Sequence, residues 1–88
     1  MYKIRNTNNR GDNVLLSPSF ATKKGAWLQA VKMAQEEAQD ILYILETDEE
    51  RNSLRLTTKG QISVKAKKYF DDEENYESVY TVERVDIC

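Results

Sequence analysis

Eight side chains of this 88-residue sequence have the chemistry and the spacing to bind an anion. Seven are lysine or arginine, and the eighth is a tyrosine, whose ring can stack on a base. They are Lys3, Arg5, Lys23, Lys24, Arg55, Lys65, Lys67 and Tyr69. Because basic side chains contact phosphates and carboxylates, this set is the candidate binding surface for a macromolecular partner.

The residue types argue against catalysis. The sequence has no histidine, so it offers neither a histidine-activated nucleophile nor a histidine metal ligand. Its one cysteine, Cys88, stands at the end of the sequence, where a thiolate is hard to position. The glycines form no phosphate-binding motif, and the acidic run 71–74 lacks the spacing of a calcium loop. We therefore expect no enzyme activity, no cofactor and no metal site.

Charge is distributed in blocks along the chain. Residues 1–27 and 51–70 carry net charges of +4 and +6, whereas residues 28–50 and 71–88 each carry −6. Blocks of this kind can build surface patches that steer a charged partner. They can equally lie on neighbouring strands and neutralise one another across a sheet. The sequence alone leaves both interpretations open.

The basic residues must be positioned by the elements around them, and the first two belong to a strand. Apolar and basic residues alternate over 2–5, which predicts a half-buried strand. Residues 6–13 are rich in Asn, Asp and Gly and predict a turn, after which 14–16 forms the return strand of a hairpin. Pro18 then stops the strand, because proline donates no ladder hydrogen bond.

A long helix is expected over residues 22–46, with Thr22 as its N-cap. Apolar residues recur at helical spacing from Trp27 to Leu45 and form one face. The alternative is a helix that ends near Gln39, followed by a buried strand over 41–45. In the single-helix interpretation the lysines at its start oppose the helix dipole, and so do Glu46, Asp48, Glu49 and Glu50 at its end. Lys23 and Lys24 beside the first-turn amides could then hold an anion.

Two more alternating segments predict a second hairpin with Gly60 in its loop. A three-residue loop over 58–60 would pair Leu56 with Ile62, which keeps the apolar residues on one face. That choice directs Arg55, Lys65, Lys67 and Tyr69 to the other face. The last strand is expected over 78–87, with a bulge at residues 83–84 that returns Val85 and Ile87 to the core.

These elements predict one α+β domain spanning residues 1–88. A β-hairpin is followed by one long helix and then by a three-stranded antiparallel meander, with the helix packed on one face of the sheet. The other face stays uncovered and carries the basic residues. No apolar run is long enough to cross a membrane, and a single cysteine fits a cytoplasmic location.

The function expected from these features is non-enzymatic binding of a protein partner through the segregated charges. Compact acidic domains of this size are typical of phage and mobile-element accessory proteins, including inhibitors, which is an analogy of type and not of motif. The alternative is a nucleic-acid-binding module on the basic sheet face, although the isoelectric point of about 5.1 argues against it. A third arrangement is a homodimer paired through edge strands, either 14–16 or 78–87.

Overall fold

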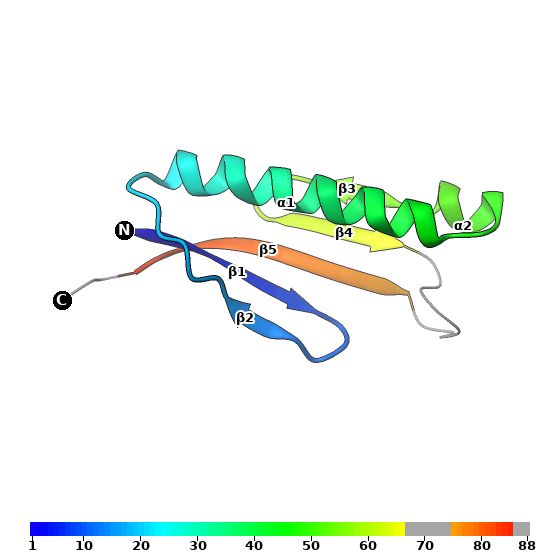
Figure 1. Cartoon of the computed structure of the whole chain (residues 1–88), viewed down its shortest axis with the longest axis horizontal. Helices are drawn as coiled ribbons and strands as arrows, with labels where there is room; N and C mark the ends of the chain where they lie inside the picture. Colours follow the sequence, from blue (N-terminus) through cyan, green and yellow to red (C-terminus); the bar gives the residue numbers. More distant parts are fainter. Residues whose placement is uncertain (67–74, 86–88) are drawn as a thin grey trace.

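The chain folds as a small α+β domain with one helix layer on one sheet (Figure 1). The computed structural model describes residues 1–66 and 75–85. Its elements in chain order are β1 (Tyr2–Asn8), β2 (Asn13–Leu15), α1 (Lys23–Ile44), α2 (Asp48–Asn52), β3 (Arg55–Thr57), β4 (Ile62–Ala66) and β5 (Tyr76–Arg84). The strands form one antiparallel sheet in the order β2-β1-β5-β4-β3. The predicted fold class is therefore confirmed.

Strand β5 lies at the centre of the sheet and joins the two hairpins. Its register with β1 is unbroken from Tyr2 opposite Arg84 to Asn8 opposite Ser78. The bulge predicted at residues 83–84 is therefore wrong. Val85 continues this register, because its backbone N–H donates to the Met1 carbonyl at 2.8 Å, and it therefore lies on the face opposite Val82; Ile87 lies outside the described residues. Residues 78–80 of β5 are paired on both sides, with β1 and β4, whereas residues 81–84 are paired with β1 alone, so the edge-strand dimer through 78–87 stays a prediction.

Helix α1 confirms the single-helix prediction. The Thr22 hydroxyl accepts a hydrogen bond from the Gly25 N–H at 3.0 Å, and the helix runs without a break to Ile44. Three alanines on its inner face, Ala26, Ala30 and Ala34, are fully buried. Alanine at these positions keeps the helix surface flat, so the helix can pack closely on β4 and β5.

The short helix α2 was not predicted, and it changes the expected helix electrostatics. Thr47 and Glu50 form a capping box at its start. Asp48, Glu49 and Glu50 therefore lie in its first turn, where the helix dipole favours negative charge. The predicted conflict between these carboxylates and the end of α1 is wrong for all three.

The second hairpin has the predicted faces but a different register. Leu56 lies opposite Val64 and not opposite Ile62, whose partner is Tyr80 on β5. A shift of one residue would have exchanged the faces, but a shift of two leaves every side chain on its own side. Burial parity therefore could not distinguish the two registers. Gly60 has a φ of 76°, the left-handed conformation expected for a glycine in this loop.

The core lies between α1 and the central strands. Its buried members are Ile4, Ala26, Ala30, Ala34, Ile41, Leu45, Ile62, Val64, Ala66 and Tyr80. Leu56, expected in the core, is 39% exposed because β3 lies at the edge of the sheet.

Truncation of Ile62 should therefore cost far more stability than truncation of Leu56. We expect Ile62→Ala to lower the free energy of unfolding by about 2–4 kcal/mol, because it opens a cavity in a closed site. Leu56→Ala should cost less than about 1.5 kcal/mol, since the side chain is partly in water already. Urea denaturation measures both values, and equal losses would contradict this placement of the core.

Candidate functional site

The sheet face opposite α1 carries four of the predicted site residues. Ile4 and Val64 are buried beneath the helix, so their neighbours in sequence point to the other side, here called the open face. These neighbours include Lys3 and Arg5 on β1 and Lys65 on β4, with Arg55 opposite Lys65 on β3. Lys67 and Tyr69 lie outside the described residues, as does the acidic run 71–74.

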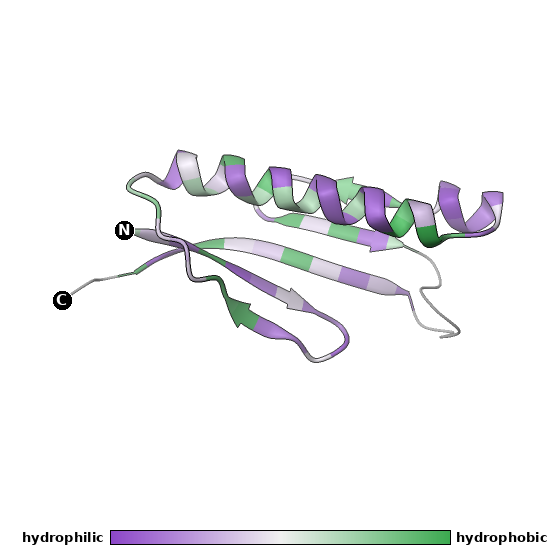
Figure 2. Cartoon of the chain, in the orientation of Figure 1, coloured by the Kyte–Doolittle hydropathy of each residue, from purple (hydrophilic) through white to green (hydrophobic). Residues whose placement is uncertain are grey.

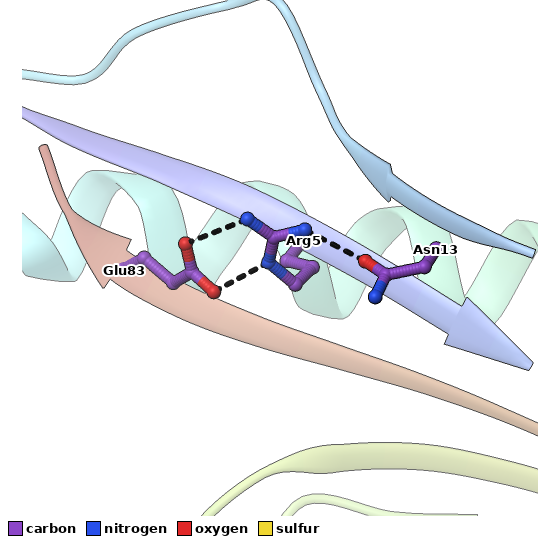
Figure 3. Close-up of polar contacts among 3 residues, drawn as sticks. All are labelled: Arg5, Asn13 and Glu83. Atoms are coloured by element: carbon purple, nitrogen blue, oxygen red, sulfur yellow. Dashed lines mark hydrogen bonds and ion pairs between the residues drawn. The ribbon is translucent and has the colours of Figure 1, made fainter.

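Arg5 is held by an acidic partner on the next strand. Its Nε lies 2.5 Å from Glu83 Oε1, its second terminal nitrogen lies 3.3 Å from Oε2, and its first donates to Asn13 Oδ1 at 2.6 Å (Figure 3). The hydrogen bond that Arg5 donates to Glu83 raises the pKa of the Arg5 guanidinium. Lys3 is the direct ladder neighbour of the same Glu83. The guanidinium therefore links β2, β1 and β5 and is not presented to a ligand.

The other open-face cations also have polar neighbours. Lys65 Nζ lies 4.0 Å from Glu77 Oε1 on β5. The Arg55 guanidinium donates to the carbonyls of Asn52 at 2.5 Å and Leu54 at 3.0 Å. Because β5 runs between the basic strands β1 and β4, its carboxylates neutralise cations on both sides. Of the two interpretations of the charge blocks, the described residues favour neutralisation on this face.

Lys23 and Lys24 do not join the open face. They are exposed in the first turn of α1, which lies on the opposite side of the sheet. The structure thus divides the predicted basic set between two faces of the molecule.

Sequence analysis missed a polar cluster between helix and sheet. Glu37 of α1 accepts hydrogen bonds from the hydroxyls of Tyr76 at 3.0 Å, Ser78 at 3.2 Å and Tyr80. Asn6 of β1 donates to the Ser78 hydroxyl at 3.0 Å. The available signal was the hydroxyl at every second residue of 76–80, which places three donors on one strand face. The cluster satisfies a half-buried carboxylate and fixes the helix on the sheet.

A second missed feature is the surface at the end of α1. Tyr43 is 92% exposed, and its neighbours Leu42 and Ile44 are also exposed. Leu42 and Tyr43 line an open hollow of about 450 Å³ together with Gln39 and Arg51. We call these five residues the Tyr43 surface. The side chain of Arg51 is held there by a 2.9 Å hydrogen bond from its Nε to the Leu45 carbonyl.

Carboxylates surround the Tyr43 surface. Asp40 lies on α1 next to Gln39, Glu46 lies in the connection to α2 and Asp48 begins α2, and all three are exposed. They belong to the acidic block 28–50 found in the sequence. The arrangement combines an exposed aromatic ring with a negatively charged surround.

Residues 1–66 and 75–85 bring no three metal-ligating side chains together, and none of their helices is long and apolar enough to cross a membrane. Comparison with protein families, with curated proteins and with solved structures finds no match for the chain.

Removal of the Glu37 carboxylate should destabilise the fold strongly. Glu37→Ala leaves three hydroxyl donors without their acceptor, and we expect a loss of at least about 2 kcal/mol in the free energy of unfolding. The exposed neighbour provides a matched control, because Glu36→Ala should change stability by less than about 0.5 kcal/mol. Urea denaturation of both variants tests this, and similar values for the two would show that the cluster stabilises nothing.

The same cluster should make stability fall in alkali. Burial, followed by the hydrogen bond to Glu37, raises the pKa of the Tyr80 phenol above its ordinary value. The stabilisation of the neutral phenol is complete below about pH 10, where tyrosine ionises in the unfolded chain, and is lost as the pH rises beyond that. Tyr80→Phe should therefore lose less stability between about pH 8 and pH 11 than the wild type. Parallel losses in urea denaturation would refute the assignment.

Proposed function

We propose that this protein is a non-enzymatic interaction module that binds a basic surface of another protein through the Tyr43 surface. The observation that carries the proposal is Tyr43 itself, 92% exposed on a rigid helix between two exposed apolar residues. Single exposed apolar residues are ordinary, but three in succession span about 200° of the helix circumference on its solvent side. Tyrosine and arginine are also the residue types on which binding energy most often concentrates.

Charge complementarity supports a basic partner. The exposed carboxylates of Asp40, Glu46 and Asp48 surround the tyrosine, so a positively charged surface would be attracted and oriented during encounter. The aromatic ring would then supply the desolvated contact that holds the complex. This arrangement reverses the sign of the binding surface predicted from sequence, because Arg5 and Lys65 lie beside carboxylates of β5.

The remaining expectations belong to the same proposal. A cytoplasmic location is supported by the single cysteine, because one cysteine cannot form a disulfide within the chain. A phage or mobile-element inhibitor would bind in this way if it covered a basic surface of a host enzyme, and that origin stays a prediction. Nucleic acid is the competing partner, and the experiment below separates the two.

Tyr43→Ala should abolish capture of the partner while the fold is kept. We would attach the wild type, Tyr43→Ala and the control Leu28→Ala to a matrix and pass lysate of the source organism over each. Leu28 is an exposed apolar residue in the first half of α1, so its removal controls for general surface stickiness. The specific partner should be retained by the wild type and by Leu28→Ala only.

Quantitative binding to the purified partner completes this test. Isothermal titration should show affinity at least about 30-fold weaker for Tyr43→Ala, as for a residue on which binding energy concentrates, and little change for Leu28→Ala. The protein–protein proposal fails if Tyr43→Ala binds like the wild type. It also fails if the wild type binds random single-stranded DNA with micromolar affinity at about 50 mM salt and Arg55→Glu with Lys65→Glu removes that binding.

A further inference from the structure

Strand β2 presents an uncharged free edge. Asp12 accepts from the Asn8 N–H through its carbonyl, and the Leu16 N–H donates to the Ile4 carbonyl, so alternate residues of this segment point toward β1. By the alternation of an antiparallel ladder, Asn13 and Leu15 point their N–H and C=O groups away from the sheet. Val14 and Leu15 are exposed there, and Figure 2 shows that the strand ends in hydrophobic residues. The opposite edge differs, because β3 carries Arg55.

An apolar pocket lies directly beside this edge, on the helix side of the sheet. It has a volume of about 420 Å³. Its lining comes from β1, from the segment after β2 and from α1, and consists of Ile4, Leu16, Ser17, Pro18, Phe20, Gln29 and Met33. No lining residue is charged. A volume in this range accommodates one large apolar side chain, since small-molecule pockets begin at about 300 Å³.

Carboxylates lie beyond the pocket, on α1 and directly before β2. Gln29 and Met33 line the pocket, and helical spacing places Glu36 on the same side of α1. Asp12, directly before β2, is exposed on the helix side of the sheet, where its carboxylate accepts a hydrogen bond from the Asn8 amide at 2.9 Å. We call the free edge of β2 together with this pocket the groove; it is apolar beside Leu16 and carries the Asp12 carboxylate at its other end.

We propose that this groove binds an extended segment of another protein as a sixth, antiparallel strand on β2. The backbone of the segment pairs with the outward N–H and C=O groups of Asn13 and Leu15. Its side chain opposite Leu16 is large and apolar and enters the pocket, while the side chain four residues later lies opposite Asp12 and is lysine or arginine. In this mode the edge supplies main-chain hydrogen bonds and the pocket supplies specificity. The site is separate from the Tyr43 surface and does not depend on it.

A second copy of this chain fits the groove less well. The two-fold pairing that uses Asn13 and Leu15 is centred on Val14, so it places Asp12 of one copy opposite Leu16 of the other. A carboxylate would then lie at the mouth of the apolar pocket, where burial disfavours charge. The sequence-based dimer through 14–16 thus becomes an outcome that the experiment separates from peptide binding.

The test uses three synthetic peptides and the full chain labelled with ¹⁵N. The first peptide is acetyl-Ser-Phe-Thr-Val-Thr-Lys-Ser-amide, which places phenylalanine opposite Leu16 and lysine opposite Asp12. The second replaces its lysine by glutamate, and the third replaces its phenylalanine by serine. Titration of the first should shift the amide resonances of Asn13, Leu15 and Met33. We expect the second to bind about two- to fivefold more weakly and the third at least about tenfold more weakly.

Two variants at one position isolate the edge hydrogen bond. Leu15→Pro removes an N–H that points away from β1, so the fold is kept while strand addition is blocked. Leu15→Thr removes the same leucine but retains the N–H. The first peptide should bind Leu15→Thr and should not bind Leu15→Pro.

Three results would overturn the proposal. The first is that no peptide shifts the resonances of β2 or the pocket. The second is that all three peptides bind alike, or that Leu15→Pro binds like Leu15→Thr. The third is a concentration-dependent dimer in analytical ultracentrifugation that Leu15→Pro disrupts, in the absence of peptide binding, which would assign the edge to a second copy.

Discussion

The carboxylate of Glu37 fixes the position of the helix on the sheet, and most of the structure depends on that position. A half-buried carboxylate is costly unless hydrogen-bond donors surround it. Strand β5 supplies them at every second residue, from Tyr76 to Tyr80, and Asn6 connects the cluster to β1. Apolar packing on a flat alanine face would tolerate sliding along the sheet, whereas three hydroxyls converge on one point. The cluster therefore sets the register of the helix over the sheet.

One helix cannot cover five strands, and this mismatch explains where the surface is unusual. A helix is about 10 Å wide and strands are about 4.8 Å apart, so α1 covers little more than β1, β5 and β4. The edge strands extend beyond it on both sides. Val14 on β2 and Leu56 on β3 are consequently exposed although both lie on the helix side. The apolar pocket beside β2 has the same origin, because the helix and the outer strand diverge there.

Local features could be predicted from the sequence, and long-range ones could not. Periodicity gave the extent of α1 and the faces of β4, since each depends on residues close in the chain. The pairing of β1 with β5 joins segments about 75 residues apart, and no local pattern specifies it. The prediction of a basic binding face was not supported for that reason, because it could not take the pairing of β1 with β5 into account. In the sequence, Arg5 and Glu83 belong to separate charge blocks, and only the strand order shows that they are neighbours.

Strand order also decides which charge block reaches the surface. Because β5 lies between β1 and β4, its carboxylates Glu77 and Glu83 form ion pairs with basic residues of those two strands. The acidic block 28–50 has no such neighbour strand, because it forms α1 and the start of α2. Glu37 and Glu50 are used internally, in the hydroxyl cluster and in the capping box. The exposed carboxylates that remain in this block therefore give the helix layer a negative surface.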